Sequence, residues 1–141
     1  MDTRQIAWLA GLYEGEGYLT IVRRNGITSP QLGIGMTDED VIRQVCDLLN
    51  FGGLTIENRY PGKTLYRWRS SCFEGVQALV AAMWPWLSVR RRIRIVEVFI
   101  EVRNAERTYK LRKVVPVESF LKAMDVEVVR DLDREQMVGG R

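Results

Sequence analysis

The chain has 141 residues, of which 46% are hydrophobic and 28% are charged, so it is long enough to bury the core of one globular domain. Its net charge is only +3, yet a sequence pI of about 9.1 is compatible with one strongly basic face. The chain contains no histidine, which excludes histidine-based catalysis, argues against a zinc site and leaves oxygen atoms as the ligands of any metal.

No apolar run approaches the roughly 20 residues that a membrane span needs, and the N-terminus does not have the pattern of a signal peptide. Cys46 and Cys72 lie in apolar contexts, and we interpret them as reduced thiols of the core. We therefore expect an intracellular protein that is neither secreted nor bound to a membrane.

Residues 3–14 predict a helix, which Asp2 and Gln5 open with the pattern of a capping box. One face of this helix carries its apolar side chains, namely Ile6, Leu9, Ala10 and Tyr13. Burial in the core and contact with a second chain both fit that face.

Gly11 and Gly15 stack one turn apart on this helix. Glycine costs roughly 1 kcal/mol relative to alanine in a helix interior, so the pair indicates that another backbone approaches closely. Gly15 and Gly17 bracket Glu16, where we expect the helix to end. Glu14 and Glu16 then lie at the negative end of the helix dipole, which is unfavourable unless a cation such as Mg²⁺ binds there.

Alternation and turn signals divide the rest of the chain into strands and helices. The expected strands are residues 18–24, 31–36, 54–60 and 64–70. The expected helices are residues 37–50, a helix from Ser71 through Met83, a long helix from Val89 to about Tyr109, and a last helix that begins at Pro116. Ser88 is the expected cap of the long helix.

The strand alternation predicts a sheet with two different faces. The apolar face, which we expect under helices, carries Leu19, Ile21, Leu32, Ile34, Met36, Leu54, Ile56, Tyr66 and Trp68. The polar face carries Tyr18, Thr20, Val22, Arg24, Gln31, Gly33, Gly35, Thr55, Glu57, Arg59, Arg67 and Arg69.

The polar face has four arginines from three strands but one glutamate and no lysine, which favours contact with nucleic acid over a merely solvated surface. Arginine and Gln31 can read base edges in the major groove. Arg23 and Lys63, near strand ends, are predicted to contact phosphates. Arg90 to Arg92 open the long helix against its dipole, so we expect Arg91 to contact phosphate as well, although a solvated basic turn also explains the run.

The stretch from Leu9 to Gly17 resembles the motif that names the LAGLIDADG homing endonucleases. The residues that keep the motif's residue or charge are Leu9, Ala10, Gly11, Leu12, Glu14, Glu16 and Gly17. Tyr13 and Gly15 depart from it. The expected element order agrees over roughly residues 4–104. The resemblance implies an α+β protein with αββαββα order, a saddle-shaped antiparallel sheet of four strands and C-terminal helices. We expect residues 1–110 to form the endonuclease core and residues 111–141 a helical extension of it.

The resemblance also implies a site-specific double-strand DNA endonuclease that uses Mg²⁺ and no small-molecule cofactor. Glu16 would bind the metal with the Gly15 carbonyl. Arg90, which follows the break at Pro85-Trp86-Leu87, stands where the family keeps a basic residue close to the metal. Asp38 stands where the family has a polar residue near the attacking water, but an ordinary acid of a first helical turn explains it equally well.

A single motif per chain implies a homodimer built through the motif helices. A two-fold dimer implies a long, roughly palindromic DNA target. The protein is then expected in an intracellular compartment that contains DNA. The expected interface residues are Leu9, Gly11, Leu12 and Gly15. Two alternatives remain open. One is a DNA- or RNA-binding protein on the same fold that does not cleave, such as a transcription regulator or a splicing maturase. The other is an interaction domain in which the glycines serve only dimerisation.

Overall fold

The structure, a computed structural model, describes residues 1–59 and 61–105. The expected helix at Pro116 and the expected extension at residues 111–141 lie outside the described residues. The elements in chain order are α1 (Thr3–Glu16), β1 (Gly17–Arg24), β2 (Ile27–Met36), α2 (Glu39–Leu49), β3 (Gly53–Arg59), β4 (Lys63–Ser70), α3 (Phe73–Met83), the 3₁₀ turn η1 (Trp84–Trp86) and α4 (Val89–Asn104). None of the helices described has the length and apolar character that crossing a membrane requires.

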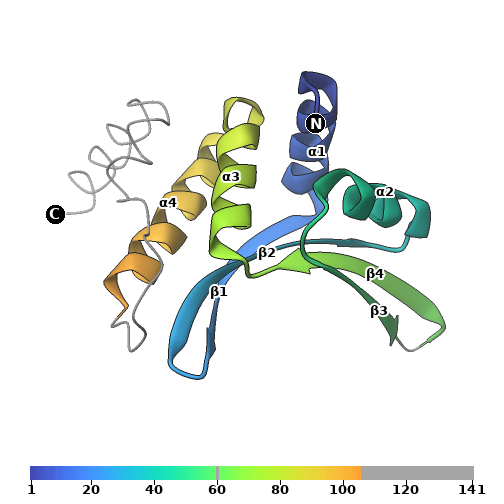
Figure 1. The fold of residues 1–141 in the computed structure, drawn as a ribbon. Helices are drawn as coiled ribbons and strands as arrows, with labels where there is room; N and C mark the ends of the chain where they lie inside the picture. The colour runs from blue at the N-terminus through green and yellow to red at the C-terminus, as the bar shows by residue number, and fades with distance from the viewer. Residues whose placement is uncertain (60, 106–141) are drawn as a thin grey trace, which may run out of the picture.

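One antiparallel sheet with the strand order β1-β2-β4-β3 forms the base of the molecule. All four α-helices lie on one side of it, and the tips of both hairpins curve away from the helices (Figure 1). The α+β class, the αββαββα order and the saddle-shaped sheet are therefore confirmed. The other side of the sheet carries no described element, so it remains open to a ligand.

Helix α1 begins as predicted and ends at Glu16, the residue that the flanking glycines indicated, two residues beyond the range 3–14. The Asp2 carboxylate accepts a hydrogen bond from the Gln5 backbone N–H at 2.9 Å, and the Gln5 side chain accepts one from the Asp2 N–H at 2.8 Å. Gly17 has extended backbone and already belongs to β1. A Cβ at Gly17 would overlap the Tyr13 ring. Glycine is thus required there for space and not for a left-handed cap.

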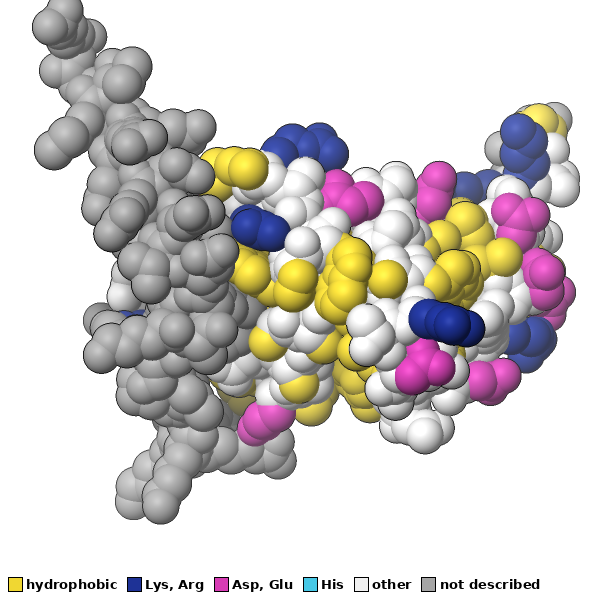
Figure 2. All heavy atoms as spheres, turned by 90° about the horizontal axis from the view of Figure 1, so that it is seen from above, with side chains coloured by type: hydrophobic (Ala, Val, Ile, Leu, Met, Phe, Trp, Pro, Cys, Tyr) yellow, Lys and Arg dark blue, Asp and Glu magenta, His cyan; other side chains and the backbone are white. Residues whose placement is uncertain are grey.

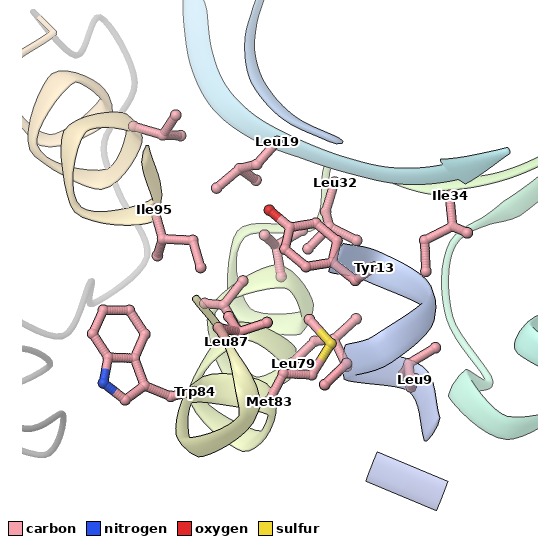
Figure 3. Packing of buried hydrophobic residues seen from close by; sticks show 14 of the residues in the cluster. Leu9, Tyr13, Leu19, Leu32, Ile34, Leu79, Met83, Trp84, Leu87 and Ile95 are labelled. Carbon is pink, nitrogen blue, oxygen red and sulfur yellow. The ribbon is translucent and has the colours of Figure 1, made fainter. Parts of the chain in front are cut away.

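The helix-side face of the sheet builds the core with α1, α3 and α4. Leu19 and Leu32 pair across β1 and β2, and Ile34 and Trp68 pair across β2 and β4. Figure 3 shows how side chains from the three helices converge on them; its labelled residues are Leu9, Tyr13, Leu19, Leu32, Ile34, Leu79, Met83, Trp84, Leu87 and Ile95. Ile56 was expected in this core but is 52% exposed, because it lies on the edge strand β3.

Strand β2 starts at Ile27, four residues before the predicted start. Asn25 and Gly26 both have positive φ, as a two-residue hairpin turn requires. The predicted start at residue 31 leaves out Pro30, and proline is rare in strand interiors. Pro30 is tolerated because β2 pairs with β4 only from Leu32 onward. At Pro30 the chain is a two-stranded ribbon with β1, so the missing N–H interrupts no bond to β4.

The interpretation of both cysteines as core thiols is wrong for one of them. Cys46 is partly buried and packs against the core. Cys72 is exposed, because it is the N-cap residue between β4 and α3, where Phe73 packs inward in its place. Both thiols are free.

Candidate active site and nucleic-acid interface

Glu16 is the last residue of α1, and its side chain is exposed. Within residues 1–59 and 61–105, no side chain or backbone N–H is bonded to its carboxylate. The last carbonyls of a helix have no intrahelical partner. The Gly15 carbonyl belongs to this group, and Gly15 is exposed as well. The end of α1 therefore presents two oxygen groups that are available to a cation.

Glu14, the other acid of the motif, is in a different situation. Its carboxylate accepts a hydrogen bond from the Ser88 backbone N–H at 2.6 Å and lies 3.0 Å from the Ser88 hydroxyl, which donates to it. Ser88 is the N-cap of α4. A carboxylate at that positive helix end is electrostatically favourable. The Glu14 side chain thus links the end of α1 to the start of α4. This corrects the expectation that Glu14 would offer oxygen to a metal.

Arg91 of α4 also bonds to the end of α1, and we call this contact between the end of α1 and the start of α4 the junction. Its guanidinium donates to the Glu14 carbonyl at 2.8 Å and lies 4.8 Å from the centre of the Tyr13 ring. Its side chain is only 16% exposed, and its Nε is 3.8 Å from the Glu14 carboxylate. Burial raises the pKa of Tyr13, and the Arg91 charge partly offsets that rise. The contact of Arg91 with phosphate stays a prediction, and its bonds within the chain favour Arg90 over Arg91 for that role.

The arginine run at the start of α4 is explained by its neighbours. Arg91 donates to a carbonyl at the negative end of α1, and Arg92 donates to the Trp84 and Pro85 carbonyls that follow α3. These cations oppose the dipole of α4 but complement the ends of the preceding helices. Arg90 is exposed and has no partner among the described residues. It is the cation of the run that remains available to a ligand.

The junction brings Glu16 and Arg90 to one end of the molecule. Glu14 and Ser88 are bonded, and Glu16 and Arg90 each come two residues later. Asp38 is the exposed N-cap of α2 and makes no capping bond with its side chain. It comes four residues after Ile34, the β2 partner of Gly17, but no described contact joins it to Glu16 or Arg90.

A metal site formed by one chain alone would be incomplete. Among the described residues there is no group of three or more His, Cys, Asp or Glu side chains able to hold a metal ion. Mg²⁺, however, keeps several waters and commonly takes one or two carboxylates together with phosphate oxygens. Glu16 and the Gly15 carbonyl are hard oxygen ligands and fit Mg²⁺ as part of a site that a substrate phosphate completes.

On the polar face of the sheet, glycines of the neighbouring strands lie opposite two of the predicted arginines. Arg69 stands between Gly33 of β2 and Gly53 of β3, and Arg67 is opposite Gly35. Arg69 has no bonded partner in the described part of the chain. Gly53 leaves open space on one side of Arg69, whereas the Tyr18 ring lies against Gly33 on the other side. The surface beside β3 is therefore the part that a groove of nucleic acid can approach.

Glu57 holds two of the arginines on this face. Its carboxylate is 2.8 Å from the Arg67 guanidinium and 3.3 Å from that of Arg59. The Tyr18 ring lies 5.9 Å from the Arg67 guanidinium on the other side. Arg67 is therefore held in one orientation, whereas Arg24 is exposed at the hairpin tip.

Two further predicted contacts take defined places. The Gln31 amide donates to the Ser71 hydroxyl at 3.1 Å, which fixes its orientation at the edge of the polar face. Lys63 is exposed opposite Arg59 at the tip of the β3–β4 hairpin, as its assignment to phosphate requires.

Arg23 was predicted to contact phosphate, but it lies on the other side of the sheet. Its guanidinium is 2.6 Å from the Glu101 carboxylate of α4. Strand alternation gives the reason, because Arg23 shares its face with Leu19 and Ile21, which pack under the helices. Arg23 therefore does not belong to the polar face.

Solved structures with this arrangement of elements bind DNA. The homing endonuclease I-CvuI, solved with the I-CreI target in the presence of Mg, matches with a TM-score of 0.51 and 17% identity over 85% of this chain and 92% of that chain. The intron-encoded homing endonuclease I-CeuI, solved with DNA, matches with a TM-score of 0.56 and 13% identity over 72% of this chain and 55% of that one. This chain has the LAGLIDADG homing endonuclease fold. The LAGLIDADG meganuclease I-AabMI, bound to uncleaved DNA, also matches, with a TM-score of 0.52 and 16% identity over 86% of this chain and 50% of that one. A scan against protein-family models and a search of curated proteins find no match.

The motif helix of this LAGLIDADG fold has a second, outward face. Gly11 and Gly15 are exposed there, and a Cβ added to either would meet nothing within 4 Å. Trp8 is 37% exposed and Leu12 is partly buried. Figure 2 shows hydrophobic side chains exposed on the helix side of the molecule. Nothing inside the described part of the chain therefore explains why both positions are glycine.

Leu9 does not belong to that outward face. It is fully buried and packs in the core of its own chain. The expectation that it contributes to a dimer interface is wrong, because no part of it is left for a second chain to touch. The core reading of Tyr13 is likewise the correct one, since it is fully buried too.

The network of Glu14, Ser88 and Arg91 was missed by sequence reasoning. Ser88 was recognised only as a helix cap, and the two sides of the junction are 74 residues apart in the chain. The local signal was a cation run at a helix start, which is unfavourable in isolation. Only the neighbouring helix ends show what these cations neutralise.

Proposed function

We propose that this chain is a site-specific DNA endonuclease that cleaves both strands of its target as a homodimer and requires Mg²⁺. The observation that carries the proposal is that a carboxylate and a guanidinium, both without a bonded partner among the described residues, lie close in sequence to the bonds of one helix junction. Glu16 and Arg90 have no partner among the described residues, and the bonds of Glu14 hold their two helices together. Glu16 also comes directly before β1, whose second residue, Tyr18, lies beneath Arg67 on the polar face.

The polar face is proposed to lie against the DNA. Arg67 and Arg69 are candidates for base contacts, with the fixed Gln31 amide beside them. Arg24, Arg59 and Lys63 lie nearer the hairpin tips and suit phosphates. The solved DNA complexes of I-CvuI and I-CeuI on the same fold support this assignment.

The reaction is hydrolysis of one phosphodiester per strand, without a covalent intermediate. Glu16 and the Gly15 carbonyl would hold Mg²⁺, which supplies an activated water and neutralises charge on the phosphate. The Arg90 guanidinium remains charged at any working pH and would stabilise the negative charge that develops on the phosphate oxygens. Asp38 is assigned to accept a hydrogen bond from the attacking water.

Two chains are required because each supplies one free carboxylate and two strands must be cut. The outward face of α1, formed by Trp8, Gly11, Leu12 and Gly15, is proposed as the contact between them. Glycine at both positions lets two helices approach closely. A two-fold dimer of this kind binds a target with approximate palindromic symmetry.

The test is cleavage of a randomised double-stranded DNA library, followed by sequencing of the cut ends. With Mg²⁺ the unchanged chain should cut one family of related sites, and EDTA should abolish cutting. Glu16→Gln should lower the cleavage rate by on the order of 1,000-fold, because the metal loses its carboxylate. Binding to the same sites in Ca²⁺ should persist. A chain that enriches sites without cutting them would be the alternative, a DNA-binding protein on the same fold that does not cleave.

The dimer is tested by Gly11→Leu, measured by analytical ultracentrifugation. Leucine favours a helix by roughly 0.8–1 kcal/mol relative to glycine, and the position is open within one chain, so the folded monomer should be at least as stable. The larger side chain should separate the two helices and shift the equilibrium toward monomer. Ala78→Leu, at an exposed position of α3, is the matched control and should leave the dimer intact. A Gly11→Leu protein that stays dimeric would place the interface elsewhere.

A further inference from the structure

The junction of α1 with α4 contains two glutamates and two arginines with contrasting surroundings. Glu14 and Arg91 are partly buried and bonded across the junction, with side chains 27% and 16% exposed. Glu16 and Arg90 are exposed and have no partner in the described residues. The free acid is two residues beyond the bonded acid, and the free arginine directly precedes the bonded one.

We propose that Glu14 and Arg91 are positioning residues that hold the Glu16 carboxylate and the Arg90 guanidinium at a fixed separation. This inference rests on the endonuclease function proposed above. Glu14 and Arg91 do not touch the reacting phosphate. They act by locking the last turn of α1 against the first turn of α4, so that the metal-binding acid and the cation approach one phosphate together.

The bonds across the junction are suited to this task because each helix supplies a side chain that bonds to the end of the other helix. The Glu14 carboxylate accepts from the N–H and hydroxyl of Ser88 at the positive end of α4. Arg91 donates to the Glu14 carbonyl at the negative end of α1. Each helix therefore satisfies the unpaired end of the other. Charge-assisted hydrogen bonds of this kind are stronger and more directional than neutral ones.

Packing beneath the junction limits the positions that Arg91 can take. The guanidinium lies over the Tyr13 ring, which is fully buried in the core. Tyr13 is one residue before Glu14 and three residues before Glu16, so its fixed ring orients the same helical turn. A displacement of a reacting group by about 1 Å can cost roughly 100-fold in rate. The rigidity of the junction is therefore matched to the precision that phosphoryl chemistry needs.

A purely structural role for Glu14 makes a different prediction. Loss of a structural bond lowers the folded fraction, and DNA binding and cleavage fall with it in proportion. Loss of a positioning bond lowers the cleavage rate and reduces the gain in DNA affinity that a divalent metal produces, while the folded dimer still binds DNA. The two roles are thus separated by comparing binding, cleavage and metal dependence in the same protein.

The test uses the full chain and the target obtained from the library selection. Glu14→Gln keeps an oxygen that can accept from the Ser88 N–H but removes the charge next to Arg91. We measure DNA affinity with and without Ca²⁺, and single-turnover cleavage across a range of Mg²⁺ concentrations. Glu97→Gln, which removes the charge from the exposed Arg94–Glu97 pair on α4, is the matched control.

Glu14→Gln should bind DNA without metal as the unchanged chain does, but cut it roughly 10- to 100-fold more slowly. The gain in DNA affinity produced by Ca²⁺ should shrink, and more Mg²⁺ should be needed for half-maximal cleavage. Ser88→Gly, which keeps the backbone N–H bond and loses only the hydroxyl, should change both quantities in the same direction by less. This milder variant also covers the case in which Glu14→Gln does not fold. Glu97→Gln should leave both unchanged.

The inference would be overturned if Glu14→Gln and Ser88→Gly both cut DNA as fast as the unchanged chain and showed the same gain in DNA affinity with Ca²⁺. The proposed endonuclease function would not be affected by that result. Losses that follow the folded fraction, as measured by thermal unfolding, would also overturn it. If the unchanged chain did not cut any DNA, the proposed function would fail and this inference with it.

Discussion

The junction of α1 with α4 and the polar face of the sheet use the same residue types in opposite ways. At the junction, Glu14 and Arg91 are partly buried and bonded within the chain, although the Arg91 Nε itself has no hydrogen-bond partner. On the polar face, Arg69 is partly exposed and has no bonded partner in the described residues. A charge that is bonded within the chain contributes to the stability of the fold, whereas a partly exposed charge without a bonded partner is available to a ligand. Burial and partners, and not residue type, separate the two roles.

The largest effect is expected at the junction. Arg91→Met keeps the apolar stem but removes the guanidinium, so the Glu14 carbonyl loses its donor and the Tyr13 ring its cation. Hydrogen bonds that involve a charged group contribute about 1.5–3 kcal/mol, and we expect a loss of that size in the free energy of unfolding. Chemical denaturation of the purified protein measures it.

Arg94→Met is the control for this prediction. Arg94 is an exposed member of an ion pair with Glu97 on the same helix. Exposed pairs contribute at most about 1 kcal/mol, so the variant should be nearly as stable as the unchanged chain. Equal losses from Arg91→Met and Arg94→Met would remove the distinction between the junction and an ordinary surface pair.

A smaller effect, on binding alone, is expected at the polar face. Arg69→Ala should weaken binding to the selected DNA site by about 1–3 kcal/mol, because the proposed bidentate contact of Arg69 to a base would be lost. It should leave the free energy of unfolding within about 0.5 kcal/mol, because Arg69 makes no bond within the described residues. Fluorescence anisotropy at fixed salt measures the first quantity and chemical denaturation the second.

Arg23→Ala is the matched control on the opposite face of the same sheet. Arg23 is exposed and pairs with Glu101 on the helix side. Its loss should change DNA affinity much less than the loss of Arg69. If Arg23→Ala weakened DNA binding as much as Arg69→Ala, the assignment of the polar face to DNA would be wrong.

Local patterns were sufficient for most of the fold. The capping box at Asp2, the alternation of the strands and the cap at Ser88 all predicted elements that the structure contains. The errors come where neighbours override the local signal. Pro30 continues a strand because β4 does not reach it, and Ile56 is exposed because β3 is at the edge.

The candidate site was harder to predict than the fold. Glu16 and Arg90 were placed by their resemblance to a motif and by the break that precedes the long helix. The difference between Arg90 and Arg91 was not predictable, because adjacent residues of one basic run have the same local surroundings in the sequence. One points to solvent and the other binds the end of α1. Arg23 and Arg24 differ for another reason, because strand alternation, a pattern present in the sequence itself, sends them to opposite faces.

Helix and strand positions, the saddle-forming order of elements and the acid at the end of the first helix follow from periodicity, caps and one motif, all of which act over a few residues. The partners of the charges depend on contacts between residues far apart in the chain, such as the 74 that separate Glu14 from Ser88. A charge changes its role when another helix end or an aromatic ring satisfies it. That information resides in the packing of α1 against α4, because no short stretch of the chain contains both sides of the contact.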